Sequence, residues 1–451
     1  AAFGYNALRK NTTADNNAGF GYYALACNTT GCQSSAVGSS ALAANTEGCF
    51  NTAVGYNALL LNTTADRNTA VGMASLGATT TGCCNTALGQ GTMAANTTGD
   101  NNVAIGTVAL SAAQTADDNT AVGYLSLQSN TTGYSNTSIG SSSSCCNTEG
   151  FQNTVLGFKA MACNTTGDNN TAIGTCALCR NVSGTNNTAV GICALDAHQS
   201  GNSNTAIGSY SLAANTTAEQ NVAVGSNTLQ ANTTGAQNVA VGRNALTANT
   251  TASDNTSVGY CSLVSNTTGT ENVAMGTEAL DSNTTGNYNT GVGFQSLQAV
   301  TTGGYNTGVG YKTLFTNTGS LNTAVGWSAL LSNTSASNNV AVGTNSSEKT
   351  TTGDQNVSVG VDSLNKNTTG TENTALGRFA LCANTTASNN TAVGKAALQS
   401  NTTGNSNVAV GTSALQSVTG SENTGVGHNT MNSAVTGQGN AAFGYSSMTA
   451  L

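Results

Sequence analysis

Apolar residues recur along the chain with a period of seventeen residues, around a glycine that we call the anchor. The residue before the anchor is Val, Ile, Leu, Met or Phe, and the fourth residue after it is nearly always Leu or Met, as in Val54, Gly55 and Leu59. The anchors run from Gly4 to Gly444, with two steps of sixteen. A short fixed period is typical of a solenoid, in which each turn of chain, or rung, is stable only when it is stacked on its neighbours.

Each rung is predicted to hold two short β-strands joined by two turns. The glycines, the Ser and Thr residues and the recurring Asn-Thr-Thr-Gly turn leave no helical segment of useful length. The chain has no proline, which would remove backbone donors from a strand ladder. We therefore expect an all-β fold, a parallel β-solenoid (β-helix or β-roll) of about 27 rungs that forms one uncapped domain over residues 1–451. At about 4.8 Å per rung the rod would be roughly 130 Å long.

The alternation of side chains along a strand predicts which residues face the core. We expect the residue before the anchor, such as Val54, to point inward together with the Leu59 column. The residue two before the anchor is Ala, Gly or Ser in every rung except at Val155, and it would then point outward. Its small size has two possible explanations. A second chain could lie close alongside this face, or the chain could be crowded locally at a bend.

Two columns of asparagine accompany the anchors. Four residues before the anchor, stacked amides are expected to form a structural ladder, represented by Asn51, Asn68, Asn85, Asn102 and Asn119. Seven residues after the anchor, sixteen of nineteen Asn residues lie in the Asn-x-Ser/Thr pattern of a glycosylation acceptor, although the Thr could serve turn hydrogen bonds instead. The glycosylation candidates are Asn11, Asn28, Asn62, Asn96, Asn130, Asn164, Asn181, Asn215, Asn232, Asn249, Asn266, Asn283, Asn333, Asn367, Asn384 and Asn401.

Several of the thirteen cysteines share a column in adjacent rungs. Residues one rung apart lie within the Cα range that a disulfide accepts. The alternative is a set of small, buried free thiols. Disulfides would indicate an oxidising, extracellular setting. The candidate pairs are Cys32 with Cys49, Cys146 with Cys163, and Cys176 with Cys193.

Charge and the remaining side chains add little chemistry. Only 7% of the residues are charged, and the eleven Lys and Arg are scattered, so we expect no nucleic-acid partner. No apolar run approaches the roughly eighteen residues of a membrane span. His198 and His428 are isolated, so we expect no enzyme, cofactor or metal site. Most acidic residues lie in the second turn of the rung. Ten anchors are followed directly by an aromatic residue, such as Tyr311 or Trp327. These rings could stack on sugars, or they could cover the edge of the core.

Two rungs, Asn102–Gly106 (Asn-Val-Ala-Ile-Gly) and Asn221–Gly225 (Asn-Val-Ala-Val-Gly), resemble the head repeat of trimeric autotransporter adhesins. They are also similar to repeats in bacteriophage and viral fibres. The resemblance implies a trimeric parallel β-roll with inward Val and Ile and with small residues at the contact between chains. The period of seventeen departs from the shorter period of that family.

These observations predict an extracellular structural fibre subunit at a cell or virion surface. We expect it to bind copies of itself, end to end through its open terminal rungs and side by side through the small column, and to carry N-linked glycans. One alternative is an adhesin or a phage or viral fibre shaft that binds cell-surface glycans. Another is an ice-binding solenoid, although the Thr that this would need is often replaced, as at Val222 and Val239.

Overall fold

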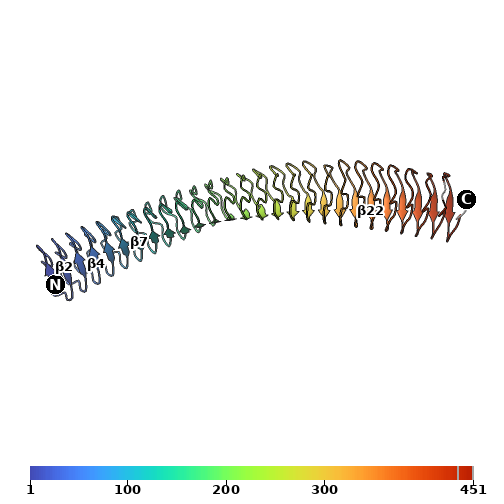
Figure 1. Cartoon of the computed structure of the whole chain (residues 1–451). Helices are drawn as coiled ribbons and strands as arrows, with labels where there is room; N and C mark the ends of the chain where they lie inside the picture. Colours follow the sequence, from blue (N-terminus) through green and yellow to red (C-terminus); the bar gives the residue numbers. More distant parts are fainter. Residues whose placement is uncertain (434–435, 449–451) are drawn as a thin grey trace. The chain divides into compact units, whose positions relative to one another are not determined.

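The computed structural model describes residues 1–433 and 436–448, in two compact units, Ala1–Ser226 and Asn227–Leu451. The described residues form 27 parallel strands and no helix, with a strand about every seventeen residues. This confirms the predicted parallel β-solenoid. Figure 1 shows the strands of each unit stacked side by side, with the turns on the opposite wall.

The strands of the first unit have two or three residues each, and each pairs in parallel with the next. They are β1 (Ala2–Phe3), β2 (Ala18–Phe20), β3 (Ser35–Val37), β4 (Thr52–Val54), β5 (Thr69–Val71), β6 (Thr86–Leu88), β7 (Val103–Ile105), β8 (Thr120–Val122), β9 (Thr137–Ile139), β10 (Thr154–Leu156), β11 (Thr171–Ile173), β12 (Thr188–Val190), β13 (Thr205–Ile207) and β14 (Val222–Val224).

The strands of the second unit repeat the same arrangement. They are β15 (Val239–Val241), β16 (Thr256–Val258), β17 (Val273–Met275), β18 (Thr290–Val292), β19 (Thr307–Val309), β20 (Thr323–Val325), β21 (Val340–Val342), β22 (Val357–Val359), β23 (Thr374–Leu376), β24 (Thr391–Val393), β25 (Val408–Val410), β26 (Thr424–Val426) and β27 (Ala441–Phe443).

Each described rung holds one strand, so the expectation of two strands per rung is wrong. The segment after the anchor is a run of turns, because two of its residues take left-handed backbone angles, with φ of 56° at Asn57 and 49° at Leu59. This wall is still hydrogen-bonded between rungs, for instance from the Leu59 N–H to the Ser75 carbonyl at 3.0 Å. The anchor must be glycine because Gly55 has φ of 137°, and a Cβ there would lie 2.6 Å from the carbonyl oxygen of Gly72.

The strand residues face the opposite way from the sequence-based expectation. Ala53 is fully buried, whereas Val54, the residue before the anchor, is 37% exposed. The Leu column does face the core as expected, and Leu59 is fully buried. The small residue is therefore the inward one, and neither a second chain nor a bend is needed to explain its size.

The physical reason for this orientation is the narrow interior of the solenoid. The Leu column fills the space opposite the strands, so that only a small side chain fits between. A Cβ added to Gly19 in β2 would already lie 3.4 Å from Cγ of Leu8 in the preceding rung, and one added to Gly291 would lie 3.3 Å from Cγ of Leu280. Valine occurs here only at Val155, which is buried and follows the rung in which Ser144 replaces the Leu; opposite a Leu, a residue of that size would overpack the core.

Candidate functional site

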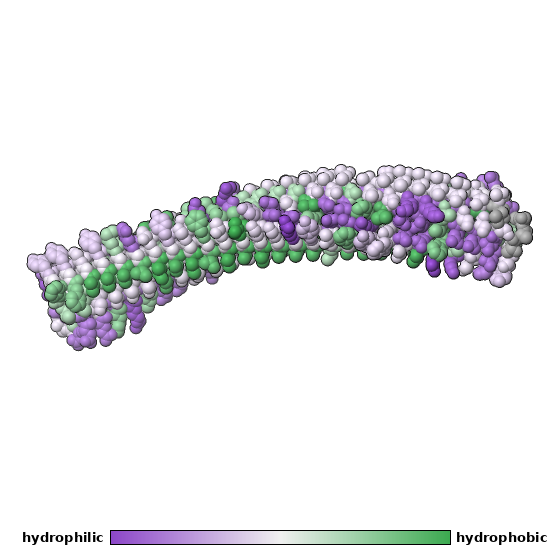
Figure 2. All heavy atoms as spheres, viewed as in Figure 1, coloured by the Kyte–Doolittle hydropathy of each residue, from purple (hydrophilic) through white to green (hydrophobic). Residues whose placement is uncertain are grey.

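The most extended feature of the surface is a row of apolar side chains on the outer face of the strands. We call it the apolar ridge and define it, within each unit, as the last residue of every strand, from β1 to β14 in the first unit and from β15 to β27 in the second. None of these residues is buried, and the exposed fraction is, for example, 46% at Leu88 and 37% at Ile105. Figure 2 shows the ridge as a green row over the strands, most clearly in the N-terminal unit. Scattered exposed apolar residues are normal, but a contiguous row of them marks an interaction surface.

The ridge is flanked by uncharged side chains. The first residue of each strand from β2 to β27 is Thr, Val, Ser or Ala, and it points to the same outer face as the ridge. None of the strands contains a charged residue. Covering the strand residues therefore removes no ionised group from water, a step that is costly, whereas Arg243, Arg378 and Lys395 lie just beyond the strands, directly after their anchors.

Comparison with known proteins gives this chain no family. No protein-family model matches the sequence, and no curated protein matches it either. The function is therefore inferred from the geometry of the chain itself.

The first asparagine column forms a buried ladder. The Asn68 N–H donates to Oδ1 of Asn51 at 2.9 Å, and Nδ2 of Asn68 donates to the Gly82 carbonyl at 2.8 Å. The same pattern continues through Asn85, Asn102 and Asn119. The Asn68 amide thus binds the backbone near the next Asn of the column, accepting from the Asn85 N–H and donating to the Gly82 carbonyl.

The second asparagine column is a ladder as well, which contradicts the expectation of glycosylation. Nδ2 of Asn45 donates to Oδ1 of Asn28 at 2.7 Å and to the Gly48 carbonyl at 2.9 Å, and both residues are fully buried. At Asn11, which is half-buried, Nδ2 donates to the Ala14 carbonyl. The fully buried candidates are Asn28, Asn62, Asn96, Asn130, Asn164, Asn181, Asn215, Asn232, Asn249, Asn266, Asn283, Asn333, Asn367, Asn384 and Asn401.

A glycan needs the same side-chain nitrogen that this ladder uses, together with access to solvent. Both are missing at the fifteen buried positions, so a glycan there would require the rung to open. The Thr next to the asparagine has a structural role, since the hydroxyl of Thr63, the middle residue of the Asn62 pattern, donates to the Thr80 carbonyl at 3.0 Å. We therefore abandon glycosylation of this column.

The thirteen cysteines are free thiols. Sγ of Cys32 lies 3.0 Å from Sγ of Cys49, as the stacked register predicts. The sulfurs of the other two candidate pairs, Cys146 with Cys163 and Cys176 with Cys193, are not hydrogen-bonded to each other in the described part of the chain. Burial raises the pKa of Cys179 to about 12, and hence keeps this thiol protonated and unreactive at neutral pH.

The acidic residues of the second turn cap backbone donors. The Cys49 N–H donates to Oδ1 of Asp66 at 2.7 Å, and the Asp100 N–H donates to Oδ1 of Asp117 at 2.8 Å. Among residues 1–433 and 436–448, no group of three or more His, Cys, Asp and Glu side chains is arranged to hold a metal ion. The same residues include no helix long and apolar enough to cross a membrane.

Some of the aromatic residues after the anchors stack on one another. The ring centroids of Phe294 and Tyr311 are 5.5 Å apart, and those of Tyr311 and Trp327 are 4.1 Å apart. The ring faces inside such a stack are occupied by neighbouring rings, so a sugar would find mainly ring edges there. In these stacks the geometry does not favour the alternative of stacking on sugars.

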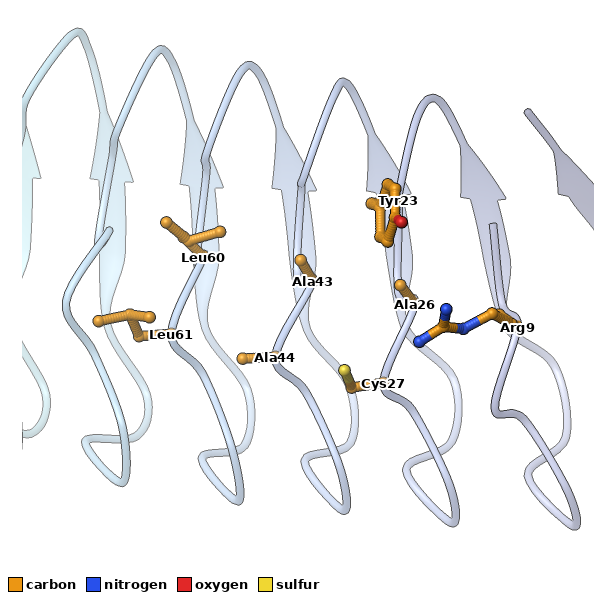
Figure 3. A pocket seen from close by; sticks show the side chains of 8 residues that line it. All are labelled: Arg9, Tyr23, Ala26, Cys27, Ala43, Ala44, Leu60 and Leu61. Atoms are coloured by element: carbon orange, nitrogen blue, oxygen red, sulfur yellow. The ribbon is translucent and has the colours of Figure 1, made fainter. Parts of the chain in front are cut away.

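A shallow apolar groove of about 250 Å³ lies on the turn wall of the first unit (Figure 3). It exists because Ala43 and Ala44 are small, whereas Leu60 and Leu61 on one side and Tyr23 on the other are large. Unlike the ridge, it depends on local side-chain size.

Proposed function

We propose that this chain is an extracellular structural fibre subunit whose copies pack side by side through the apolar ridge. The observation that supports this proposal is the ridge itself, which presents one apolar side chain per rung on an uncharged face. Covering the exposed part of each such side chain would contribute roughly 0.5–1 kcal/mol, and the contributions add along the row.

The partner that fits the ridge best is a second copy of the chain. A partner must present apolar groups at the spacing of the rungs over many rungs, and the same ridge on another copy has that spacing. The resemblance to the trimeric heads of autotransporter adhesins agrees with self-association. We propose a location outside the cell because a disulfide between the stacked Cys32 and Cys49 would persist in an oxidising environment. End-to-end stacking stays a prediction.

An ice-binding face is the main rival for the same surface. The ridge side chains differ in size, from Val37 to Leu88 and Phe20. An uneven row of this kind fits a deformable protein partner better than a rigid crystal lattice. The proposal therefore commits to a protein partner, and freezing-point measurements on the purified chain give the rival its own test.

Sedimentation velocity of the whole chain tests the proposal. We expect the wild type to sediment as an assembly larger than the 44.6 kDa monomer, and the triple variant Val54→Lys, Ile105→Lys, Ile207→Lys to sediment as a monomer.

A matched control adds the same charge to exposed apolar residues outside the ridge, as Leu61→Lys, Met73→Lys and Ile192→Lys. This control should assemble like the wild type. A wild type that stays monomeric at high concentration, or a ridge variant that still assembles, would overturn the proposal.

A further inference from the structure

Cys32 and Cys49 occupy the same position in two consecutive rungs, eleven residues after Gly21 and Gly38. Both are half-buried, so a small reagent can reach them. Their sulfur atoms lie 3.0 Å apart, and the Cys32 N–H also lies 3.0 Å from Sγ of Cys49.

The stacking of the rungs holds this contact in place. In other rungs the same position carries a carboxylate that accepts the N–H of the preceding rung, as Oδ1 of Asp100 accepts the Cys83 N–H at 2.7 Å. Sγ of Cys49 takes the role of that oxygen. Because the ladder fixes the backbone on both sides, only side-chain rotation can separate the two sulfurs while the ladder stays intact.

We infer that Cys32 and Cys49 form an oxidation site at which a disulfide links two consecutive rungs. The oxidant is a small-molecule disulfide, such as oxidised glutathione. One cysteine thiolate attacks it, which forms a mixed disulfide and releases one glutathione thiolate. The other cysteine thiolate then attacks the protein sulfur of the mixed disulfide and releases the second glutathione thiolate. The protein loses two protons and two electrons, and the oxidant becomes two glutathione thiols.

The surroundings of the pair set its pH dependence. The hydrogen bond with Cys49 raises the pKa of the Cys32 thiol, and the nearby Asp66 carboxylate acts in the same direction. The thiolate is the reactive form, so the link should form faster as the pH is raised above neutrality. The inference is independent of the proposed function, since it needs only the stacking of two rungs.

Peptide mapping of the full chain tests the inference. After incubation with oxidised glutathione, free thiols are alkylated and the protein is cleaved after Glu47, which lies between the two cysteines. We expect a pair of peptides joined through Cys32 and Cys49, with Cys27 alkylated. Cys27→Ser is the matched control and should leave the link unchanged.

In Cys49→Ser we expect the joined peptides to disappear and Cys32 to be recovered as a mixed disulfide with glutathione or as an alkylated thiol. Alkylation of both cysteines in the oxidised wild type, glutathione on each of them, or a link from either one to Cys27 would overturn the inference.

Discussion

Nδ1 of His198 lies 3.3 Å from Nδ2 of Asn215, inside the buried column that is otherwise mostly asparagine. Nε2 of His198 lies 2.7 Å from the Gly201 carbonyl. The neutral imidazole thus reproduces an asparagine amide, since its Nε2–H donates to the carbonyl while Nδ1 accepts from the next rung. If Nδ1 of His198 were also protonated, its N–H would face the Nδ2 donor of Asn215.

Stability is therefore expected to fall in acid. Burial lowers the pKa of His198 below its ordinary value of 6.5, so the unfolded chain takes up the proton more readily than the folded one. The stabilisation is complete above about pH 6.5 and is lost as the pH falls below it, with a slope of at most about 1.4 kcal/mol per pH unit. Around the ring, Asn181 and Asn215 face it from the adjacent rungs and carry no charge, and Asp196 is the acidic residue of its own rung.

Chemical denaturation of wild type and His198→Asn between pH 5 and pH 8 measures this effect. The variant restores the amide of the column. Its unfolding free energy should therefore not show the decrease below pH 6.5 that His198 causes in the wild type. Equal pH profiles for the two proteins would show that His198 is not responsible.

Thr79 interrupts the same column and leaves two buried oxygen atoms, Oγ1 of Thr79 and Oδ1 of Asn62, without hydrogen-bond partners. Thr79→Asn should restore a donor to Asn62 and raise the unfolding free energy by about 1–3 kcal/mol. Thr79→Val, which removes the hydroxyl but supplies no donor, should give a smaller gain. If denaturation curves rank the valine variant above the asparagine variant, the ladder does not contribute the stability that its geometry indicates.

Neighbouring residues of β7 test the facing of the strand. Ala104 is fully buried against the Leu column, whereas Ile105 lies on the ridge. Ala104→Leu should cost about 1–3 kcal/mol or more by overpacking, and Ile105→Thr should change monomer stability by less than about 0.5 kcal/mol. Denaturation should be measured at low protein concentration, so that association does not contribute. If Ile105→Thr were the more destabilising of the two, Ile105 would face the core and Ala104 would face solvent, as the sequence-based expectation had it.

The period and the glycine anchors were enough to predict the solenoid, because a repeated rung without proline or helix-forming segments has few other ways to fold. The direction of Ala53 and Val54 could not be predicted in the same way. Side chains alternate between the two faces of a strand, so the pattern alone allows either Ala53 or Val54 to be the buried one. A register shift of one residue exchanges the buried and the exposed set. The deciding quantity is the width of the interior opposite Leu59, which depends on the left-handed turn residues. The invariably small residue was the available signal, and it is best explained by an inner position.

The asparagine columns show a second limit of the sequence. The acceptor pattern at Asn62 describes three neighbouring residues, whereas the role of the amide depends on residues one rung away. Stacked Asn-x-Thr repeats place Nδ2 on a carbonyl inside the turn, where it is unavailable to a sugar. The ridge was missed for the same reason as the strand orientation, since its residues were assigned to the core.

The central claim is that copies of this chain meet through the outer faces of their strands. Electron cryo-microscopy of the assembled wild-type protein tests it most directly, because a cross-section perpendicular to the fibre axis resolves each solenoid and its strand wall. We predict strand walls of neighbouring copies facing each other at about 10 Å, the distance at which sheets pack, with the Asn-Thr-Thr turns directed outward. Fibres joined through those turns, or single solenoids with the ridge exposed to solvent, would contradict the account.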